Sequence, residues 1–323
     1  MLGAADISAT DWIVFLAAIL VFLALDLGVF HRKAKVIRFR EAFFWTAIWF
    51  LLAMGFGMLL APRMVEDWGS QQTYEFVTGY IIELSLSMDN VFVIALIFAY
   101  FRLGQKYQHR VLFWGILGAL LMRGAMIWAG VQLIQRIKWM LYALGAFLIY
   151  TGIKMLFSKE EGVHPEKNVA IRVARKFFPV SNDFDGERFT TMFQGRRTLT
   201  PLALVLLMVE TTDLIFALDS IPAIFAVTLD PFIVFTSNVF AILGLRSLYF
   251  VLAGAIEYFR YLRFGLSVVL IFIGIKMLLA KTRYHIPTTT SLFVVGGIIL
   301  ISILISAIAA RHGHPPKPDR SSS

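Results

Sequence analysis

The chain contains no cysteine. This absence excludes disulfide bonds, thiolate metal sites and cysteine nucleophiles, and it leaves the redox compartment undetermined. All six histidines fall in predicted loops or in the tail, namely His31, His109, His164, His285, His312 and His314. Because zinc and copper favour thiolate and imidazole ligands, neither metal is favoured for a site inside the apolar segments.

Charged residues are also few, at 16% of the chain against about 25% in a typical soluble domain. Hydrophobic residues make up 59%, and the mean hydropathy is +0.75. Nine windows approach or exceed the roughly 20 apolar residues that cross a bilayer core: 11–30, 41–60, 74–101, 109–133, 139–157, 200–227, 231–258, 262–280 and 289–310. The first has no basic region before it, so we predict a retained helix and not a signal peptide. The sequence therefore predicts an all-α polytopic integral membrane protein.

The basic residues predict the orientation of the chain. The net charge is +9, and 21 of the 30 Lys and Arg fall in segments on one side of the membrane: 31–40, 101–110, 158–199, 259–263 and the tail from 311. The loops on the other side hold five, namely Arg63, Arg136, Lys138, Lys281 and Arg283. The positive-inside rule then places the amino terminus outside and the carboxyl terminus in the cytoplasm. Since the basic residues are divided among loops and form no single stripe, nucleic-acid binding is disfavoured.

Two acidic motifs interrupt the apolar windows. The first is Glu-Leu-Ser-Leu-Ser-Met-Asp-Asn at 83–90, and the second is Glu-Thr-Thr-Asp-Leu-Ile-Phe-Ala-Leu-Asp-Ser at 210–220. In each motif an acid precedes a second acid by six positions, and a small polar residue follows. Aligning the motifs pairs Glu83 with Asp213, Asp89 with Asp219, and Asn90 with Ser220. We interpret the pair as a cation site inside the membrane.

Helical periodicity groups the polar residues of these motifs. At 100° per residue, Glu83, Ser87 and Asn90 share one face of a helix, while Ser85 and Asp89 form a second stripe about 120° away. In the second motif, Glu210 and Asp213 share a face. Each of these polar stripes requires protein or water neighbours.

Two arginines, Arg123 and Arg246, also lie well inside apolar windows. A charged side chain at mid-bilayer costs about 2.5–3.5 kcal/mol on insertion scales, so neither the acids nor the arginines can face lipid. We expect arginine pairing to neutralise two of the acids, and the remainder require a cation or protons. The donors are hard oxygens, which favour Mg, Ca or Mn. Met88 is either a softer thioether ligand that prefers Mn or plain packing.

Asp26 and Pro222 are further candidates for the cation path. Asp26 lies near the inner end of the first window, where it is either a snorkelling acid or part of that path. Pro222 cannot donate to the carbonyl four residues back, so we predict a broken helix that presents the carbonyl of Leu218 beside Asp219.

Segments 74–157 and 200–281 form a predicted internal repeat. Gly-Ile-Lys-Met-Leu occurs at both 152–156 and 274–278, and Ile-Leu-Gly at both 116–118 and 242–244. Each copy holds three helices, so the second must cross the membrane in the opposite sense. Such inverted repeats are typical of secondary transporters, whose substrate lies at the repeat interface near the midplane.

The other segments flank or connect these repeats. Residues 1–73 hold two peripheral helices, 282–310 the last helix, and 311–323 a tail that we predict to be disordered. The cytoplasmic segment 158–199 carries Val169, Val173 and Phe177 one turn apart with basic neighbours, as in a helix lying on anionic lipid. Residues 188–200 predict a short hairpin.

The motifs resemble those of the TerC family of bacterial integral membrane proteins, and within it the Alx-like branch. The resemblance covers nearly the whole chain apart from the tail. It is carried by the first motif extended through Phe92, by the second extended through Ala226, and by Thr-Ser-Asn-Val-Phe-Ala-Ile-Leu-Gly-Leu-Arg at 236–246. The family is associated with tellurium resistance, and Alx-like members with manganese export and alkaline induction.

What this resemblance implies is efflux of Mn²⁺ from the cytoplasm across the bacterial inner membrane, with no resident cofactor and no enzymatic activity. It also implies a ligand set of Glu83, Asp89, Asn90, Glu210, Asp213, Asp219 and Ser220. The predicted partners are the lipid bilayer, a divalent cation and counter-transported protons.

Two alternatives come from other functional classes. A membrane scaffold of a metal-stress complex would act through the cytoplasmic segment 158–199. An intramembrane aspartyl enzyme would use Asp89 and Asp219 as a dyad, but neither Met-Asp-Asn nor Leu-Asp-Ser resembles the Tyr-Asp and Gly-x-Gly-Asp contexts of presenilin-like proteases.

Overall fold

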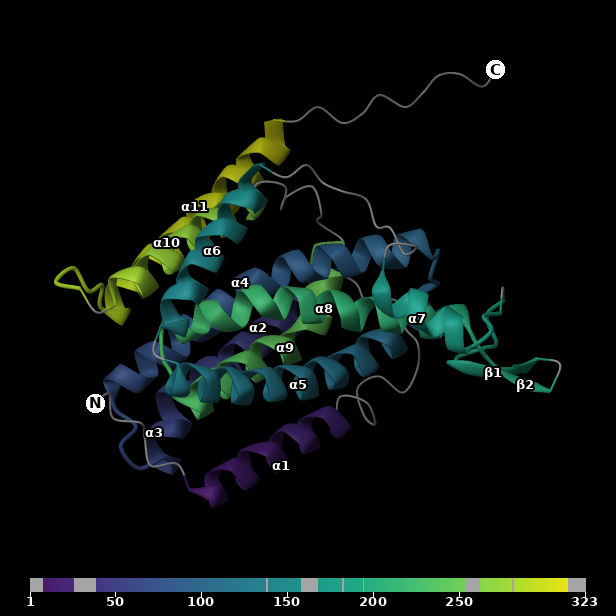
Figure 1. Ribbon diagram of the computed structural model, residues 1–323, viewed down its shortest axis with the longest axis horizontal. Helices are drawn as coiled ribbons and strands as arrows, with labels where there is room; N and C mark the ends of the chain where they lie inside the picture. Colours follow the sequence, from purple (N-terminus) through teal and green to yellow (C-terminus); the bar gives the residue numbers. More distant parts are fainter. Residues whose placement is uncertain are drawn as a thin grey trace.

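The computed structural model describes residues 8–25, 39–137, 139–157, 168–181, 183–193, 195–253, 262–280 and 282–312. The chain in these ranges is mainly helical (Figure 1). The helices and strands are α1 (Ala9–Leu25), α2 (Phe39–Gly55), the π-helix η2 (Phe56–Leu60), α3 (Ala61–Met64), α4 (Ser70–Tyr100), α5 (Gln105–Arg136), α6 (Met140–Phe157), α7 (Val169–Phe177), β1 (Thr190–Phe193), β2 (Arg196–Leu199), α8 (Pro201–Phe225), α9 (Pro231–Ala253), α10 (Leu262–Leu279) and α11 (Thr288–His312). The predictions for Asp26 and for the tail from residue 313 lie outside the described residues.

Eight helical spans in the described ranges are long and apolar enough to cross a membrane. Helices suit this environment because they satisfy every backbone polar group internally where no water is available. The first predicted window corresponds to α1, whose apolar stretch Thr10–Phe22 is shorter than a full span. The chain is therefore a multi-pass membrane protein, with eight spanning helices and one shorter apolar helix in its described part.

The second predicted window, 41–60, lies within a longer helical segment. The helix that begins at Phe39 continues through η2 into α3 and ends at Met64. Gly57 in η2 lies against the ring of Phe76, where a larger residue would clash. The Gly57 carbonyl also accepts a hydrogen bond from the Trp68 indole at 3.2 Å. Only residues 65–69 connect α3 to α4.

Proline and capping residues define the ends of α8 and α9. Pro201 occupies the first turn of α8, and the Asp230 carboxylate caps α9 by accepting from the amides of Phe232 (2.9 Å) and Ile233 (3.2 Å). The prediction of a broken helix at Pro222 is wrong, because α8 continues through it to Phe225. A proline near a helix end removes one hydrogen bond, and the following turn still forms here.

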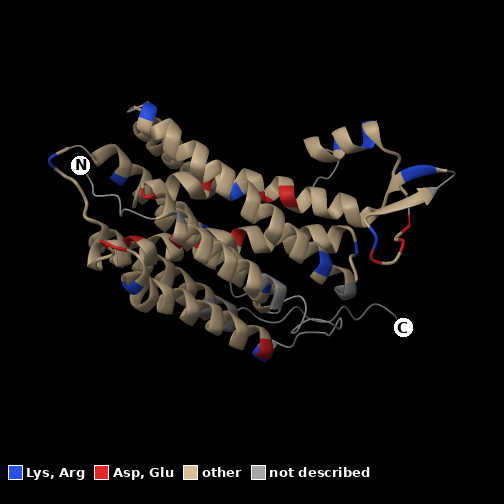
Figure 2. Ribbon diagram, turned by 90° about the horizontal axis from the view of Figure 1, so that it is seen from below, with Lys and Arg blue, Asp and Glu red and all other residues tan. Residues whose placement is uncertain are grey.

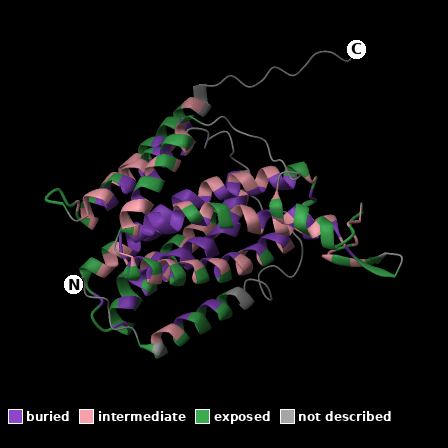
Figure 3. Cartoon of the chain, viewed as in Figure 1, coloured by how far each residue is buried: buried purple, intermediate pink, exposed green. Residues whose placement is uncertain are grey.

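Helix α9 is the centre of the bundle. It packs against α2, α4 and α5, and its most apolar window is buried along its whole length. Figure 3 shows the buried residues gathered between the long helices, with exposed residues on the outer faces. Because α9 is shielded from lipid, its polar residues Thr236, Ser237 and Asn238 can all be buried at the middle of the protein.

Helices α6 and α10 approach each other at backbone distance. A Cβ atom added to Gly145 would lie 3.0 Å from the carbonyl oxygen of Gly274, and one added to Gly152 would lie 2.9 Å from that of Ser267. Small residues allow such close helix packing in membranes. Since the contacts advance along α6 as they retreat along α10, the two helices are antiparallel. In Figure 1 they run beside α11 and cross the direction of the other long helices.

These contacts are also reciprocal between the two predicted copies. With the two Gly-Ile-Lys-Met-Leu segments aligned, Gly152 corresponds to Gly274 and Gly145 to Ser267. In the aligned copies, the contact of Gly145 with Gly274 therefore corresponds to the contact of Ser267 with Gly152, as expected of two elements related by a two-fold axis. This packing supports the inverted repeat at its third helices, and the complete 3+3 repeat stays a prediction.

The described part of segment 158–199 forms the predicted amphipathic helix and hairpin. In α7, Val169, Val173 and Phe177 are exposed on one side, while Ile171 is buried against the core. Strands β1 and β2 pair antiparallel around a turn at Gly195, whose φ of +74° suits glycine. In Figure 2 basic residues colour α7 and this hairpin, whereas few charged residues lie part-way along the long helices. The predicted contact of α7 with anionic lipid stays a prediction.

We predict that Gly274→Ala destabilises the protein, because the added methyl group would lie 2.6 Å from the Gly145 carbonyl. Overpacking of this kind typically costs about 1–3 kcal/mol. Thermal unfolding of the detergent-solubilised protein measures the effect. Gly297→Ala in α11 is the matched control, since its Cβ would meet nothing within 4 Å. Equal melting temperatures for the two variants would contradict the close α6–α10 packing.

Candidate cation site

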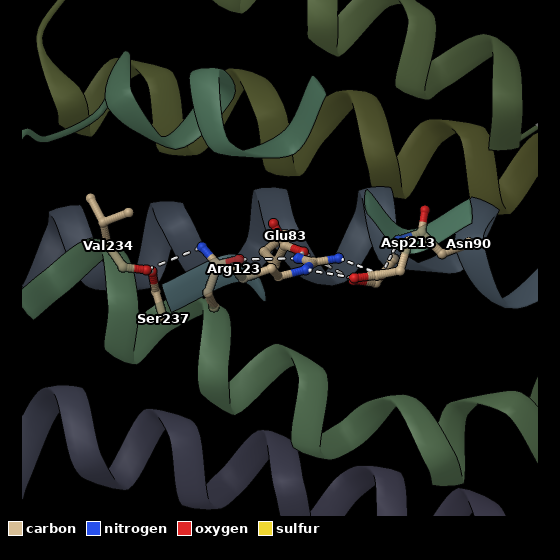
Figure 4. A network of polar contacts seen from close by, with 8 residues as sticks. Glu83, Asn90, Arg123, Asp213, Val234 and Ser237 are labelled. Carbon is tan, nitrogen blue, oxygen red and sulfur yellow. Dashed lines mark hydrogen bonds and ion pairs between the residues drawn. The ribbon is translucent and has the colours of Figure 1, made fainter. Parts of the chain in front are cut away.

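The polar centre of the bundle is built around Arg123 on α5, whose side chain is 1% exposed. Its guanidinium makes a two-pronged ion pair with Asp213 on α8, with Nη2–Oδ1 at 2.9 Å and Nε–Oδ2 at 3.2 Å. Nη1 pairs with Oε1 of Glu83 on α4 and donates to Oδ1 of Asn238 on α9 at 3.0 Å. Figure 4 shows the guanidinium lying between the two carboxylates. Arg123 thus joins α4, α8 and α9 to α5.

Helix α4 presents the predicted polar face to this centre. Ser87 Oγ donates to Glu83 Oε1 at 3.3 Å, and Asn90 Nδ2 donates to Asp213 Oδ1 at 3.3 Å. All three α4 residues are buried. The prediction that Glu83, Ser87 and Asn90 act from one face is therefore confirmed, and that face points at the second acidic motif.

Glu210 lies one turn before Asp213 on α8 and also faces α5. Its carboxylate rests against Gly118, where a Cβ atom would overlap it. Asp213 and Glu210 are close enough for their charges to repel. Gly118 therefore provides the space that lets a third carboxylate approach the Arg123 cluster.

Three acceptor atoms in this cluster have no hydrogen-bond partner within the described part of the chain. They are Glu83 Oε2, Asn90 Oδ1 and Glu210 Oε2, and all three are buried. A buried polar atom without a partner costs about 1–3 kcal/mol, and more when it is charged. All three accept and none donates, so the group that satisfies them is a cation or a water molecule.

The charges of the cluster do not balance. Glu83, Glu210 and Asp213 supply three carboxylates, and Arg123 supplies one guanidinium. Two negative charges remain when all four groups are ionised. This excess equals the charge of one divalent cation or of two protons.

Other predicted site residues lie elsewhere on the same helices. Asp219 is half-buried and faces Thr151 and Lys154 on α6, while the Ser220 hydroxyl is buried without a partner in the described residues. Asp89 is half-buried on the second stripe of α4. The first and second acids of the motifs therefore belong to different surroundings.

The seven predicted ligands do not form one preassembled metal site in this conformation. Within the described residues no group of three or more His, Asp or Glu side chains is arranged to hold a metal ion. Between Glu83 and Asp213 the reason is visible, because Arg123 lies there (Figure 4). The role of each of the seven as a metal ligand stays a prediction.

The structure shows the surroundings of three predicted supporting residues, namely Arg123, Arg246 and Met88. Arg123 pairs with two acids as expected, whereas Arg246 on α9 contacts His109 on α5, with Nη2–Nδ1 at 2.9 Å. His109 thus lies inside a helix, and its prediction as a loop residue is wrong because α5 begins at Gln105. Met88 packs against apolar core residues, in agreement with its reading as packing.

Besides Arg123, two residues of the centre lie outside both acidic motifs. Asn238 is one of several polar residues in α9, and Gly118 matches Gly244 of the predicted repeat. The sequence signal for Asn238 is an amide in the middle of an apolar window. No comparable signal marks Gly118, because its role comes only from its proximity to Glu210.

Comparisons with known proteins agree with a multi-pass membrane protein. Residues 68–314 match the model of the integral membrane protein TerC family. An uncharacterized membrane protein of Myxococcus xanthus is 50% identical over 301 residues, covering 93% of each chain. An Escherichia coli K12 protein named "Putative membrane-bound redox modulator Alx" is 44% identical over 301 residues, covering 92% of this chain and 94% of that one.

A more distant relative is similar over almost its full length. An uncharacterized membrane protein of Rickettsia bellii is 39% identical over 298 residues, covering 92% of this chain and 97% of that one. No solved structure matches the chain. The family match and these relatives together show that the chain belongs to the TerC family of integral membrane proteins, and that it is similar to the Alx proteins within it.

Proposed function

We propose that this protein exports divalent cations, above all Mn²⁺, from the cytoplasm through the cluster around Arg123. The observation that carries the proposal is the coincidence of three buried oxygens that have no partner in the described part of the chain with three carboxyl groups around one guanidinium. A structural ion pair alone would need neither feature. Both are what a site needs if it binds and then releases a positive ion.

The ligand chemistry supports a hard cation. The free acceptors are two carboxylate oxygens and one amide oxygen, which suit Mg²⁺, Ca²⁺ and Mn²⁺ better than Zn²⁺ or Cu²⁺. The preference for Mn²⁺ within this group comes from the resemblance to Alx-like proteins. Because carboxylates must lose their protons to bind a metal, protons are the natural ions for exchange.

The location follows from the charge of the loops and from the bacterial relatives. We place the protein in the bacterial inner membrane with the amino terminus outside, since the basic segments 101–110 and 158–199 then face the cytoplasm. The acidic cluster lies part-way along α4, α5, α8 and α9, away from the ends of these helices. An ion would therefore reach it through the bundle and not from lipid.

The redox description of the Escherichia coli relative has one consequence for this chain. Without cysteine, the chain cannot act by thiol–disulfide exchange. A change in the supply of a redox-active metal such as manganese is a route that needs no thiol. Metal export therefore accommodates that description without a redox centre in the protein.

A second function, that of a scaffold, is favoured by the exposed cytoplasmic surface. Met192 on β1 is 66% exposed, and α7 presents an unpaired apolar stripe. A scaffold would keep working when the buried acids are neutralised and would fail when segment 168–199 is deleted. A transporter would lose its flux when the acids are neutralised.

The central test measures Mn²⁺ flux by the purified protein in liposomes. We predict that Glu210→Gln lowers the flux at least about tenfold, because one of the buried charged ligands is lost. Glu66→Gln in the loop between α3 and α4 is the matched control. Parallel assays with Mg²⁺, Ca²⁺, Zn²⁺ and Fe²⁺ define the selectivity. If wild-type protein gives no flux of any of these ions above that of protein-free liposomes, the export proposal fails.

Gly118→Ala tests the packing around Glu210. The added methyl group would overlap the Glu210 carboxylate, so we predict several-fold lower Mn²⁺ flux with little change in the melting temperature. Alanine in a helix is intrinsically favourable, by about 1 kcal/mol over glycine. Gly296→Ala, whose Cβ would meet nothing within 4 Å, is the control. Full flux in both variants would mean that the position of Glu210 does not matter.

The lack of native cysteines makes the topology directly testable. We predict that a cysteine introduced in place of Glu66 reacts with a membrane-impermeant maleimide in right-side-out vesicles. A cysteine in place of Met192 should react only after the membrane is permeabilised. The opposite pattern would reverse the orientation, and with it the direction assigned to export.

A further inference from the structure

We propose that Arg123 is a tethered competitor of the transported cation. In the arrangement shown in Figure 4 its guanidinium takes the position beside Glu83 that the substrate ion uses. Binding of the ion moves the guanidinium off Glu83, while Asp213 and Asn238 retain it. This inference rests on the proposed function and assigns Arg123 a role in releasing the ion.

The contacts of Arg123 make this exchange possible. Asp213 alone holds Nη2 and Nε, in the bidentate geometry that arginine forms best. Nη1 has two partners, Glu83 Oε1 and Asn238 Oδ1. If Glu83 is withdrawn, each bonded nitrogen still keeps a partner. The bond to Glu83 is therefore the one that the guanidinium can lose at least cost.

The neighbours of Glu83 show what replaces the guanidinium. Glu83 Oε2, Asn90 Oδ1 and Glu210 Oε2 are buried acceptors without partners in the described chain, and Ser87 adds a hydroxyl that already contacts Glu83. Since buried ion pairs are stable only when their remaining lone pairs are satisfied, a purely structural Glu83–Arg123–Asp213 triad would not leave these atoms free. Glu83, Ser87 and Asn90 present oxygens from one face of α4, and Glu210 adds a carboxylate from α8, so a divalent cation that displaces the guanidinium from Glu83 would meet hard oxygens.

Charge explains why a transporter benefits from such a residue. Without Arg123, three ionised carboxylates would lack any compensating charge when neither a metal ion nor a proton is bound, in a medium where unpaired charge is expensive. The guanidinium lowers the energy of that state and so favours release of the ion. Removing the positive charge should therefore tighten ion binding and slow turnover. If Arg123 were only a structural contact, its loss would instead weaken ion binding and slow turnover together.

The experiment compares Arg123→Gln and Asn238→Leu with wild type in two measurements. Equilibrium binding of Mn²⁺ to the detergent-solubilised protein gives the Kd, and proteoliposome flux gives the maximal rate. For Arg123→Gln we expect a Kd lower by about tenfold and a maximal flux lower by a similar factor. For Asn238→Leu we expect a higher Kd, because the guanidinium loses its alternative partner and remains on Glu83.

Further variants keep the test decisive. Arg123→Lys retains the charge without the bidentate fork, so its Kd should stay nearer to wild type than that of the glutamine variant. Arg110→Gln, which removes an ion pair with Glu187 away from the cluster, should bind Mn²⁺ like wild type. If Arg123→Gln does not fold, the Asn238→Leu and Arg123→Lys measurements still apply.

The outcomes separate this inference from the proposed function. If the wild-type protein neither binds nor transports a divalent cation, both the export function and the competitor role of Arg123 are refuted. Wild-type protein that transports Mn²⁺, with an Arg123→Gln Kd unchanged or raised, would refute the competitor role alone. An Asn238→Leu Kd equal to or below the wild-type value would also refute it. Opposite shifts of Kd in the two variants would support it.

Discussion

The ion pair of Arg123 with two acids from different helices is the interaction on which the bundle centre depends. One guanidinium joins Glu83 of α4 and Asp213 of α8 to α5, and reaches Asn238 of α9 as well. Breaking a buried pair by removing one partner typically costs about 3–5 kcal/mol, because the other charge is left without compensation. The four helices are therefore held in register by charge as well as by packing, in a lipid environment that offers no hydrophobic force between helices.

The surrounding packing separates this centre from lipid. Helix α9 is enclosed by α2, α4 and α5, so its amide and hydroxyl groups never meet the hydrocarbon. The tight contact of α6 with α10, made possible by Gly145 and Gly274, forms a second unit beside the first. Asp219 faces that second unit through Thr151 and Lys154 of α6. The second acidic motif thus spans two structural surroundings, which gives its two aspartates different neighbours.

The excess of acid over arginine in this cluster is the feature that favours the proposed cation site over a purely structural ion pair. Glu210 is the residue that creates the excess, and it is admitted to the cluster by the absence of a side chain at Gly118. If the protein exports a divalent cation as proposed, a fixed positive charge beside the acids would serve two purposes. It would stabilise the cluster when no cation is bound, and it would favour release of a bound cation.

The sequence by itself determined the membrane class, the helices and their approximate ends, the hairpin, and the polar face of Glu83, Ser87 and Asn90. These features follow from hydropathy, periodicity and turn residues, which are local properties of the chain. It also indicated that arginines would neutralise some of the acids. Only the tertiary structure decided that Arg123 takes Glu83 and Asp213, that Asp219 faces α6, and that α8 continues through Pro222. Which acid pairs with which arginine depends on the distance between helices that are far apart in sequence, and helical periodicity carries no information on that distance.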